Sequence, residues 1–60
     1  MKKYKFKIDQ GSNDKETTIY LNDEEIAHAD YDENGWDGMH LIENITEKIG
    51  RILDIDVEYV

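Results

Sequence analysis

The sequence predicts a small α+β domain of the order β-β-β-α-β, an antiparallel three-stranded meander followed by one amphipathic helix and a final strand. Three observations support this. Residues 3–9 and 55–59 alternate between apolar and polar side chains with the two-residue period of a strand. Residues 41–53 carry apolar side chains with a helical period. Runs rich in Gly, Asn, Asp and Ser, which favour tight turns, separate the first segments.

The first three strands are expected at residues 3–9, 17–21 and 25–32. The first places aromatic and aliphatic side chains on one face and lysines on the other. Residues 10–14 are dense in turn formers and predict a hairpin, and Asn22-Asp23 predicts a second tight turn. The second strand is β-branched and aromatic, which favours a strand over a helix.

The helix is the strongest local prediction. Asn34 or Asp37 is expected to cap its start, because either side chain can accept a free backbone N–H. Gly50 leaves an early end open, but the apolar pattern favours a helix that runs to Leu53, with Asp54 in the left-handed conformation. At about 100° per residue the apolar side chains fall within an arc of about 120°; they are Leu41, Ile42, Ile45, Ile49, Ile52 and Leu53. The opposite side carries His40, Glu43, Asn44, Glu47 and Arg51.

Residues 55–60 form the last expected strand, and charge predicts its place. We expect it beside the first strand and parallel to it, giving the spatial order fourth, first, second, third. On the uncovered face Lys3, Lys5 and Lys7 then neighbour Asp56 and Glu58, and cross-strand pairs of opposite charge are stabilising.

The helix is expected to cover one face of this sheet, close to Ala27 and Ala29, with Trp36 plugging the end of the core. The whole chain, residues 1–60, is expected to form one domain. The predicted core consists of Tyr4, Phe6, Ile8, Ile19, Leu21, Ala27, Ala29, Tyr31, Trp36, Leu41, Ile42, Ile45, Ile49, Ile52, Leu53, Ile55, Val57 and Tyr59.

Composition excludes several classes of protein. With no cysteine the chain forms no disulfide and no thiolate metal site. No apolar run reaches the length of a signal peptide or of a membrane span, so a cytoplasmic protein is expected. The net charge is −8, and residues 8–60 hold all fifteen acids against three cations. Such a surface repels nucleic acid and anionic lipid and attracts basic protein surfaces. The same charge also serves to keep a small protein in solution.

Three groups of residues are candidates for binding. The first is an acidic band for a basic protein partner: Asp23, Glu24, Glu25, Asp30, Asp32, Glu33 and Asp37. Glu43 and Glu47 would extend this band. The second is the open face of the sheet, where a mixed polar and apolar patch predicts a homodimer; it comprises Thr18, Tyr20, Ile26 and His28.

The third candidate is a calcium loop. Asp30, Asp32 and Asn34, followed by Gly35, match the first half of the motif D-x-[DN]-x-[DN]-G. The second half fails, because Leu41 occupies the twelfth position, where a bidentate Glu belongs. A polar strand-to-helix connection is the stronger interpretation, and no metal or cofactor is expected.

Catalysis is not expected. The one serine, Ser12, falls in a predicted turn, and His28 and His40 have no metal-ligand spacing. No sequence feature places two carboxylates in an apolar pocket that would separate their pKa values.

Small size, acidity and the lack of a catalytic set are similar in style to the inhibitor proteins that phages and mobile elements encode against host enzymes, including defence enzymes. The prediction is therefore an acidic inhibitor that docks on a basic surface of a larger, nucleic-acid-handling enzyme. A self-associating adaptor that uses the open sheet face is the alternative, and a calcium-stabilised domain is the third.

Overall fold

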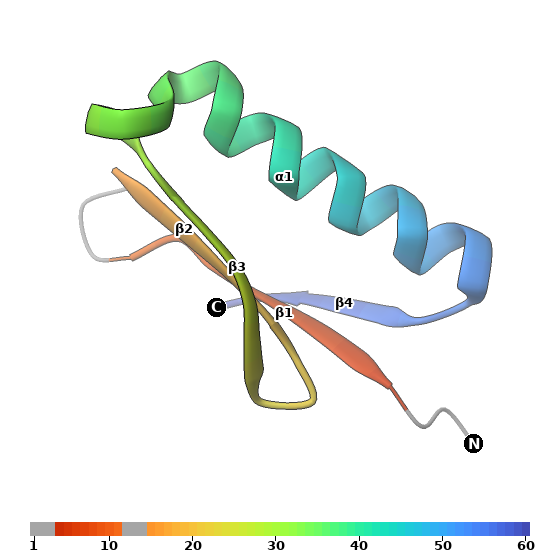
Figure 1. Ribbon diagram of the computed structural model, residues 1–60. Helices are drawn as coiled ribbons and strands as arrows, with labels where there is room; N and C mark the ends of the chain where they lie inside the picture. Colours follow the sequence, from red (N-terminus) through yellow and green to blue (C-terminus); the bar gives the residue numbers. More distant parts are fainter. Residues whose placement is uncertain (1–3, 12–14) are drawn as a thin grey trace.

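The computed structural model describes residues 4–11 and 15–60. The described chain forms strands β1 (Lys5–Asp9), β2 (Glu16–Leu21) and β3 (Glu24–Asp30), helix α1 (Tyr31–Leu53) and strand β4 (Asp56–Tyr59) (Figure 1). The strands form one mixed sheet in the order β3-β2-β1-β4. β2 is antiparallel to both of its neighbours, and β4 is parallel to β1. The predicted fold class and strand order are confirmed.

The predicted charge pairing between β1 and β4 is confirmed. Lys5 lies opposite Asp56, and Lys7 lies opposite Glu58. The Lys5 ammonium group forms an ion pair with Glu58, which is diagonal to it across the two strands. This hydrogen-bonded contact lowers the pKa of Glu58 and raises the pKa of Lys5. Both side chains are about half exposed, so the pair contributes little to stability.

The turns agree with the sequence where they are described. Asn22 and Asp23 both have positive φ, 51° and 71°, as the two-residue hairpin between β2 and β3 requires. The Asn22 side chain also accepts a hydrogen bond from the Lys5 backbone N–H at 3.0 Å, which ties the turn to β1. Residues 12–14 of the predicted first turn, Ser12 among them, and Lys3 of the predicted first strand lie outside the described residues.

The start of the helix differs from the prediction. Asp30 is the N-cap, and its Oδ1 accepts a hydrogen bond from the Glu33 N–H at 2.8 Å. The Asn34 side chain in turn accepts from the Asp30 N–H at 3.1 Å. The third strand therefore ends at Asp30 and not at Asp32, and neither Asn34 nor Asp37 is the cap. Gly35, at φ 70° and ψ 174°, interrupts the helical conformation, so α1 has a first turn, a kink and then a long regular part.

The end of the helix agrees with the prediction. α1 runs to Leu53, and Asp54 takes the left-handed conformation at φ 56°. The Gly50 carbonyl accepts hydrogen bonds from the N–H groups of Asp54 and Ile55, which closes the last turn. Only Asp54 and Ile55 separate α1 from β4, so the last turn of the helix is held close to that strand.

The buried core is small. Phe6 and Ile8 of β1 pack with Ile19 of β2, and Ala29 and Met39 are also buried. Leu21, Ala27, Ile42, Ile55 and Val57 pack around this centre and remain partly accessible. The expectation that Ala27 and Ala29 lie beneath the helix agrees with their burial. Half of the predicted core is exposed instead: Tyr4, Tyr31, Trp36, Leu41, Ile45, Ile49, Ile52, Leu53 and Tyr59.

The reason for this error is the rotation of the helix about its axis. The buried residues of α1 are Met39, Glu43, Thr46 and Gly50. On a wheel of about 100° per residue they span about 60°, centred roughly 110° from the middle of the apolar arc. Glu43, predicted on the solvent side, is 7% exposed and faces the sheet. The arc of leucine and isoleucine side chains is therefore turned away from the sheet and is largely exposed.

Two contacts favour this rotation. The Thr17 hydroxyl of β2, fully buried, donates a hydrogen bond of 2.7 Å to Glu43 Oε2, and the Gln10 amide approaches the same oxygen at 3.4 Å. At the other end, Gly50 lies so close to β4 that an added Cβ would sit 2.7 Å from Val57 Cγ2 and 2.9 Å from the Ile55 carbonyl oxygen. A larger side chain at position 50 would push the helix away from the sheet.

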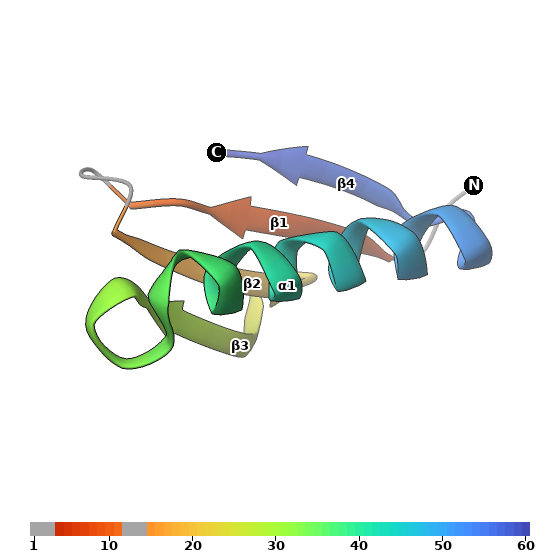
Figure 2. The same cartoon turned by 90° about the horizontal axis from the view of Figure 1, so that it is seen from above.

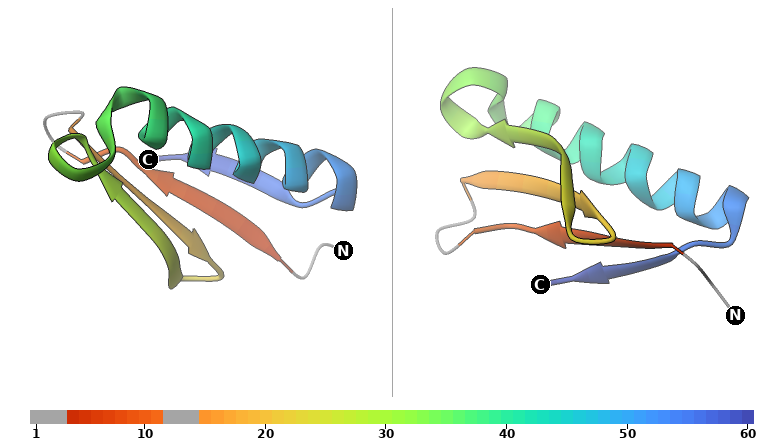
Figure 3. Two further views of the ribbon diagram at one scale, coloured as in Figure 1. Left: turned by 45° about the horizontal axis from the view of Figure 1, so that its top comes forward. Right: turned by 60° about the horizontal axis from the view of Figure 1, so that its bottom comes forward.

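The helix crosses one face of the sheet from the end of β3 to the start of β4 (Figure 2). Two further views show α1 on one side only, so the opposite face of the sheet is open (Figure 3). Among the described residues, no helix combines the length and apolar character needed to cross a membrane.

The close approach at Gly50 predicts that Gly50→Ala destabilises the protein. Overpacking costs about 1–3 kcal/mol and should outweigh a gain in helix propensity of about 1 kcal/mol. Urea unfolding followed by circular dichroism measures the difference. Asn44→Ala, on an exposed part of α1, is the control and should leave stability unchanged or raise it. A Gly50→Ala variant as stable as the wild type would contradict the close contact.

The buried hydrogen bond predicts that Thr17→Val is more harmful than Thr18→Val. The first change removes the short donor to a buried carboxylate, which should lower the free energy of unfolding by about 1–3 kcal/mol. The second removes an exposed hydrogen bond of 2.8 Å between Thr18 and His28 Nδ1, and should cost less. Equal losses in urea unfolding would mean that the Glu43 contact does not stabilise the helix on the sheet.

Candidate protein-binding surfaces

A strip of exposed apolar side chains runs along α1. Five side chains there are 39% to 70% exposed, and we call them the aliphatic face: Leu41, Ile45, Ile49, Ile52 and Leu53. Their spacing of four, four, three and one residues places them in one strip along the helix. Figures 2 and 3 show no helix or strand over the side of α1 that faces away from the sheet.

An exposed strip of this kind needs an explanation. Single exposed apolar residues are ordinary, whereas contiguous patches mark interaction sites. Fully burying one Leu or Ile side chain contributes about 1.5–3 kcal/mol, so five partly exposed ones represent a substantial gain on covering. The sequence identified these residues by their helical period but assigned them to the core.

The acidic residues gather at both ends of β3, an edge strand of the sheet. The acidic turn, Asp23, Glu24 and Glu25, lies where β3 begins. The acidic helix start, comprising Asp30, Asp32, Glu33 and Asp37, lies where β3 ends. β3 has seven residues, so about 20 Å separates the two groups. The predicted band is thus divided into two clusters along one edge.

Most of these carboxylates are free to meet a partner. Within residues 4–11 and 15–60, no ion pair forms at Glu24, Glu25, Asp32, Glu33 or Asp37. Asp23 lies 3.5 Å from the Lys7 ammonium group, yet its side chain is 87% exposed.

Glu43 and Glu47 do not extend the acidic edge. Glu43 is buried against the sheet, and Glu47 accepts a hydrogen bond of 2.7 Å from the Tyr59 hydroxyl of β4. Partial burial, with this hydrogen bond, raises the pKa of Tyr59 to about 12. Both glutamates therefore hold α1 on the sheet.

The open face of the sheet is a weaker candidate for an apolar contact. Thr18 and His28 are joined by their hydrogen bond, and Tyr20 is half-buried. Ile26, beside an irregularity in the pairing of β2 with β3, is 51% exposed. Lys5 and Lys7 with their acidic partners occupy the rest of this face, so it is largely polar.

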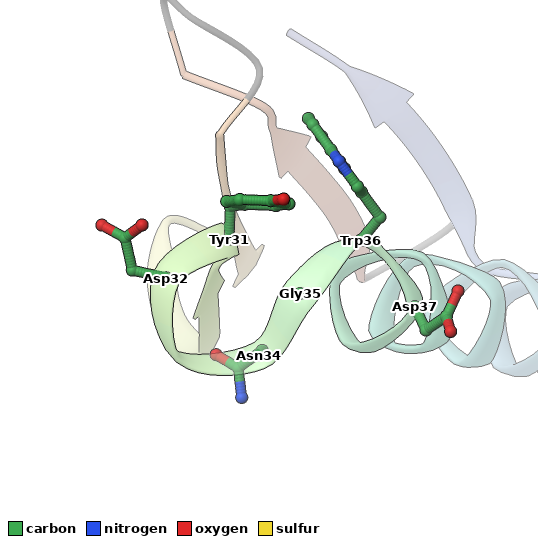
Figure 4. Close-up of a pocket in the computed structure, with 6 residues that line it drawn as sticks. All are labelled: Tyr31, Asp32, Asn34, Gly35, Trp36 and Asp37. Carbon is green, nitrogen blue, oxygen red and sulfur yellow. The ribbon is translucent and has the colours of Figure 1, made fainter.

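The aromatic residues near the kink form an exposed stack and do not plug the core. The rings of Tyr31 and Trp36 lie 4.9 Å apart between centroids, and His40 follows at 6.4 Å from Trp36. Trp36 is 45% exposed, so its predicted role as a plug is wrong. Tyr31 and Trp36 line a shallow, open hollow with Asp32, Asn34 and Asp37 (Figure 4).

The acidic loop is organised as a helix cap. The side-chain oxygens of Asp30 and Asn34 accept backbone hydrogen bonds, and Figure 4 shows Asp32 pointing away from Asn34. The described part of the chain contains no group of three His, Cys, Asp or Glu side chains arranged to hold a metal ion.

A polar cavity lies between α1 and the sheet. It measures about 280 Å³ and is lined by Gln10, Thr17, Trp36, Met39, His40 and Glu43. His40 Nδ1 lies 3.6 Å from Glu43 Oε1, but the other oxygen of that carboxylate already accepts from Thr17. No pattern in the sequence indicated this cluster. The small residues Thr46 and Gly50, four apart, were the available signal of a close helix–sheet contact on this side of α1.

Comparison with protein-family models, curated protein sequences and solved structures finds no match to this chain.

The capping role of the acidic loop predicts that calcium does not stabilise the protein. A ligand that binds the native state at a concentration 100 times its Kd would add about 2.7 kcal/mol. We expect millimolar CaCl₂ and the same ionic strength of NaCl to give equal melting temperatures. A rise specific to calcium, abolished by Asp32→Asn, would establish a calcium site instead.

Proposed function

We propose that this chain is a protein-binding inhibitor that docks on a basic surface of a larger protein, such as an enzyme that handles nucleic acid. The supporting observation is that the acidic turn and the acidic helix start are exposed at the two ends of β3, with five of their carboxylates unpaired within the described residues.

The distribution of cations supports a directional surface. Lys5 and Lys7 lie on the open face and are paired with Glu58 and Asp23. Lys15 lies beside the acidic helix start, where its carbonyl accepts a hydrogen bond of 2.8 Å from the Tyr31 N–H, but the acids outnumber it and the edge along β3 is negative. Such a field speeds encounter with a positive partner and disfavours negative ones. The nucleic-acid-binding site of an enzyme is positively charged and would be such a partner.

The inhibitor acts by occupying a site and needs no chemistry of its own. Among the described residues, His40 lies near the Glu43 carboxylate, but that carboxylate accepts a hydrogen bond from Thr17 and helps to pack α1 against β2. Edge strand β3 also has one unpaired side between the acidic groups, which gives the partner backbone groups to contact.

The first test is an affinity purification of the tagged protein from nuclease-treated bacterial lysate at low and moderate salt. We expect a stoichiometric partner that is lost as salt screens the charges, since the Debye length falls to about 10 Å at 0.1 M. Recovery of the bait alone, or a partner retained equally at both salt concentrations, would contradict the proposal.

Matched variants test which acids bind. Glu24→Gln with Glu25→Gln, and separately Asp32→Asn with Glu33→Gln, each remove two negative charges from the edge. Each pair should weaken the partner's affinity about tenfold, or about 1.4 kcal/mol. The control, Asp56→Asn with Glu58→Gln, removes two charges from β4 and should have a smaller effect. Equal losses for all three would indicate only a dependence on net charge.

A further inference from the structure

We propose that the cavity between α1 and the sheet binds the ammonium group of a lysine side chain, which the basic partner inserts beside the buried carboxylate of Glu43. This inference rests on the proposed docking on a basic surface and deepens it, because it names a side chain that the partner supplies and the residues that receive it. The site is separate from the acidic edge, whose exposed carboxylates attract the partner through solvent.

Glu43 is a buried carboxylate with neutral hydrogen-bond donors. Its side chain is 10% exposed. Oε2 accepts a hydrogen bond of 2.7 Å from the Thr17 hydroxyl and has the Gln10 amide at 3.4 Å. Within residues 4–11 and 15–60, no Lys or Arg forms an ion pair with this carboxylate. A buried charge is costly unless an opposite charge pairs with it, so a cation bound here would offset that cost.

The second oxygen, Oε1, is the one that a cation can reach. Its contact with His40 Nδ1 measures 3.6 Å, which is longer than a hydrogen bond, and the His40 side chain is 63% exposed. Because Thr17 already bonds Oε2, one oxygen remains for a ligand. An ammonium group is a point charge that pairs with one oxygen, whereas a guanidinium group is best matched by both oxygens of a carboxylate. The geometry therefore favours lysine over arginine.

The size and lining of the cavity suit the aliphatic stem of a lysine. Its volume of about 280 Å³ exceeds the roughly 30 Å³ that one water molecule occupies, but is below the roughly 300–1,000 Å³ of sites for drug-sized ligands. Met39 and Trp36 supply apolar walls for the methylene groups. An ammonium group near the face of the indole ring would also gain a cation–π contact.

The cavity lies next to the acidic helix start. Trp36 lines both this cavity and the open hollow that contains Asp32 and Asp37. A basic surface drawn to these acids would bring its lysines close to the cavity. Lys15, two residues before Thr17, is exposed and is not among the residues that line the cavity.

A nuclear magnetic resonance titration of the full chain with Nα-acetyl-lysinamide tests the site. We expect a Kd of about 1 mM, with shifts at Thr17, Glu43 and the indole of Trp36, which is the single tryptophan. Acetyl-norleucinamide lacks the charge and acetyl-argininamide replaces the ammonium group, and each should bind at least about tenfold more weakly. Equal shifts at Glu24 and Glu25 of the acidic turn would indicate only non-specific attraction and would overturn the site.

Matched variants test the residues. Glu43→Gln keeps an acceptor for Thr17 and removes the charge, so it should weaken lysinamide binding at least about tenfold. Glu47→Gln removes the same charge from α1 four residues further on, outside the lining, and should bind like the wild type. Trp36→Leu, at a side chain 45% exposed, leaves the buried hydrogen bond in place and should weaken binding about threefold. Circular dichroism checks folding, and undiminished binding by the Glu43 and Trp36 variants would overturn the site.

The partner separates this inference from the proposed function. Lysinamide binding at Glu43, with no basic partner recovered from lysate, would leave the cavity site standing and the proposed function rejected. A salt-sensitive partner that binds Glu43→Gln as tightly as the wild type would support the docking and reject the insertion of a lysine.

Discussion

The contact of α1 with the sheet at two points, Gly50 against β4 and Glu43 against Thr17, is the constraint on which the rest of this structure depends. The absence of a side chain at position 50 lets the last turn of the helix reach Val57 and the Ile55 backbone. The hydrogen bond from Thr17 then fixes the rotation of the helix further along. Because the connection to β4 is two residues long, the helix has little freedom to turn once its last turn is seated.

This rotation decides which side chains are available for function. It places a glutamate and a threonine at the sheet, and it turns a strip of leucine and isoleucine outwards. An isolated domain with a small core gains by having that strip covered. The acidic edge is decided separately, by the position of β3 at the side of the sheet and by Asp30, which caps the helix where the strand ends. The aliphatic face and the acidic edge therefore arise from different features of the fold.

Much of the fold could be predicted because it depends on local patterns. The alternation in residues 5–9 and 55–59, the Asn22-Asp23 turn and the left-handed Asp54 all appear as expected. The order of the strands followed from pairing the lysines of β1 with the acids of β4. The start of the helix was missed because Gly35 suggests a loop, while the turn before it is held by side-chain caps from Asp30 and Asn34 that a periodic pattern does not show.

The sequence by itself determined the element order, the topology, the absence of thiol chemistry and the acidity of the surface, since these follow from composition, short-range periodicity and charge pairing. Only the tertiary structure decided the direction in which the helix faces. Periodicity locates an apolar strip on a helix, but the side turned to the sheet depends on backbone proximity at Gly50 and on one hydrogen bond between residues 26 positions apart. For that reason Leu41, Ile45 and Ile49, predicted as core, are exposed on the surface of α1.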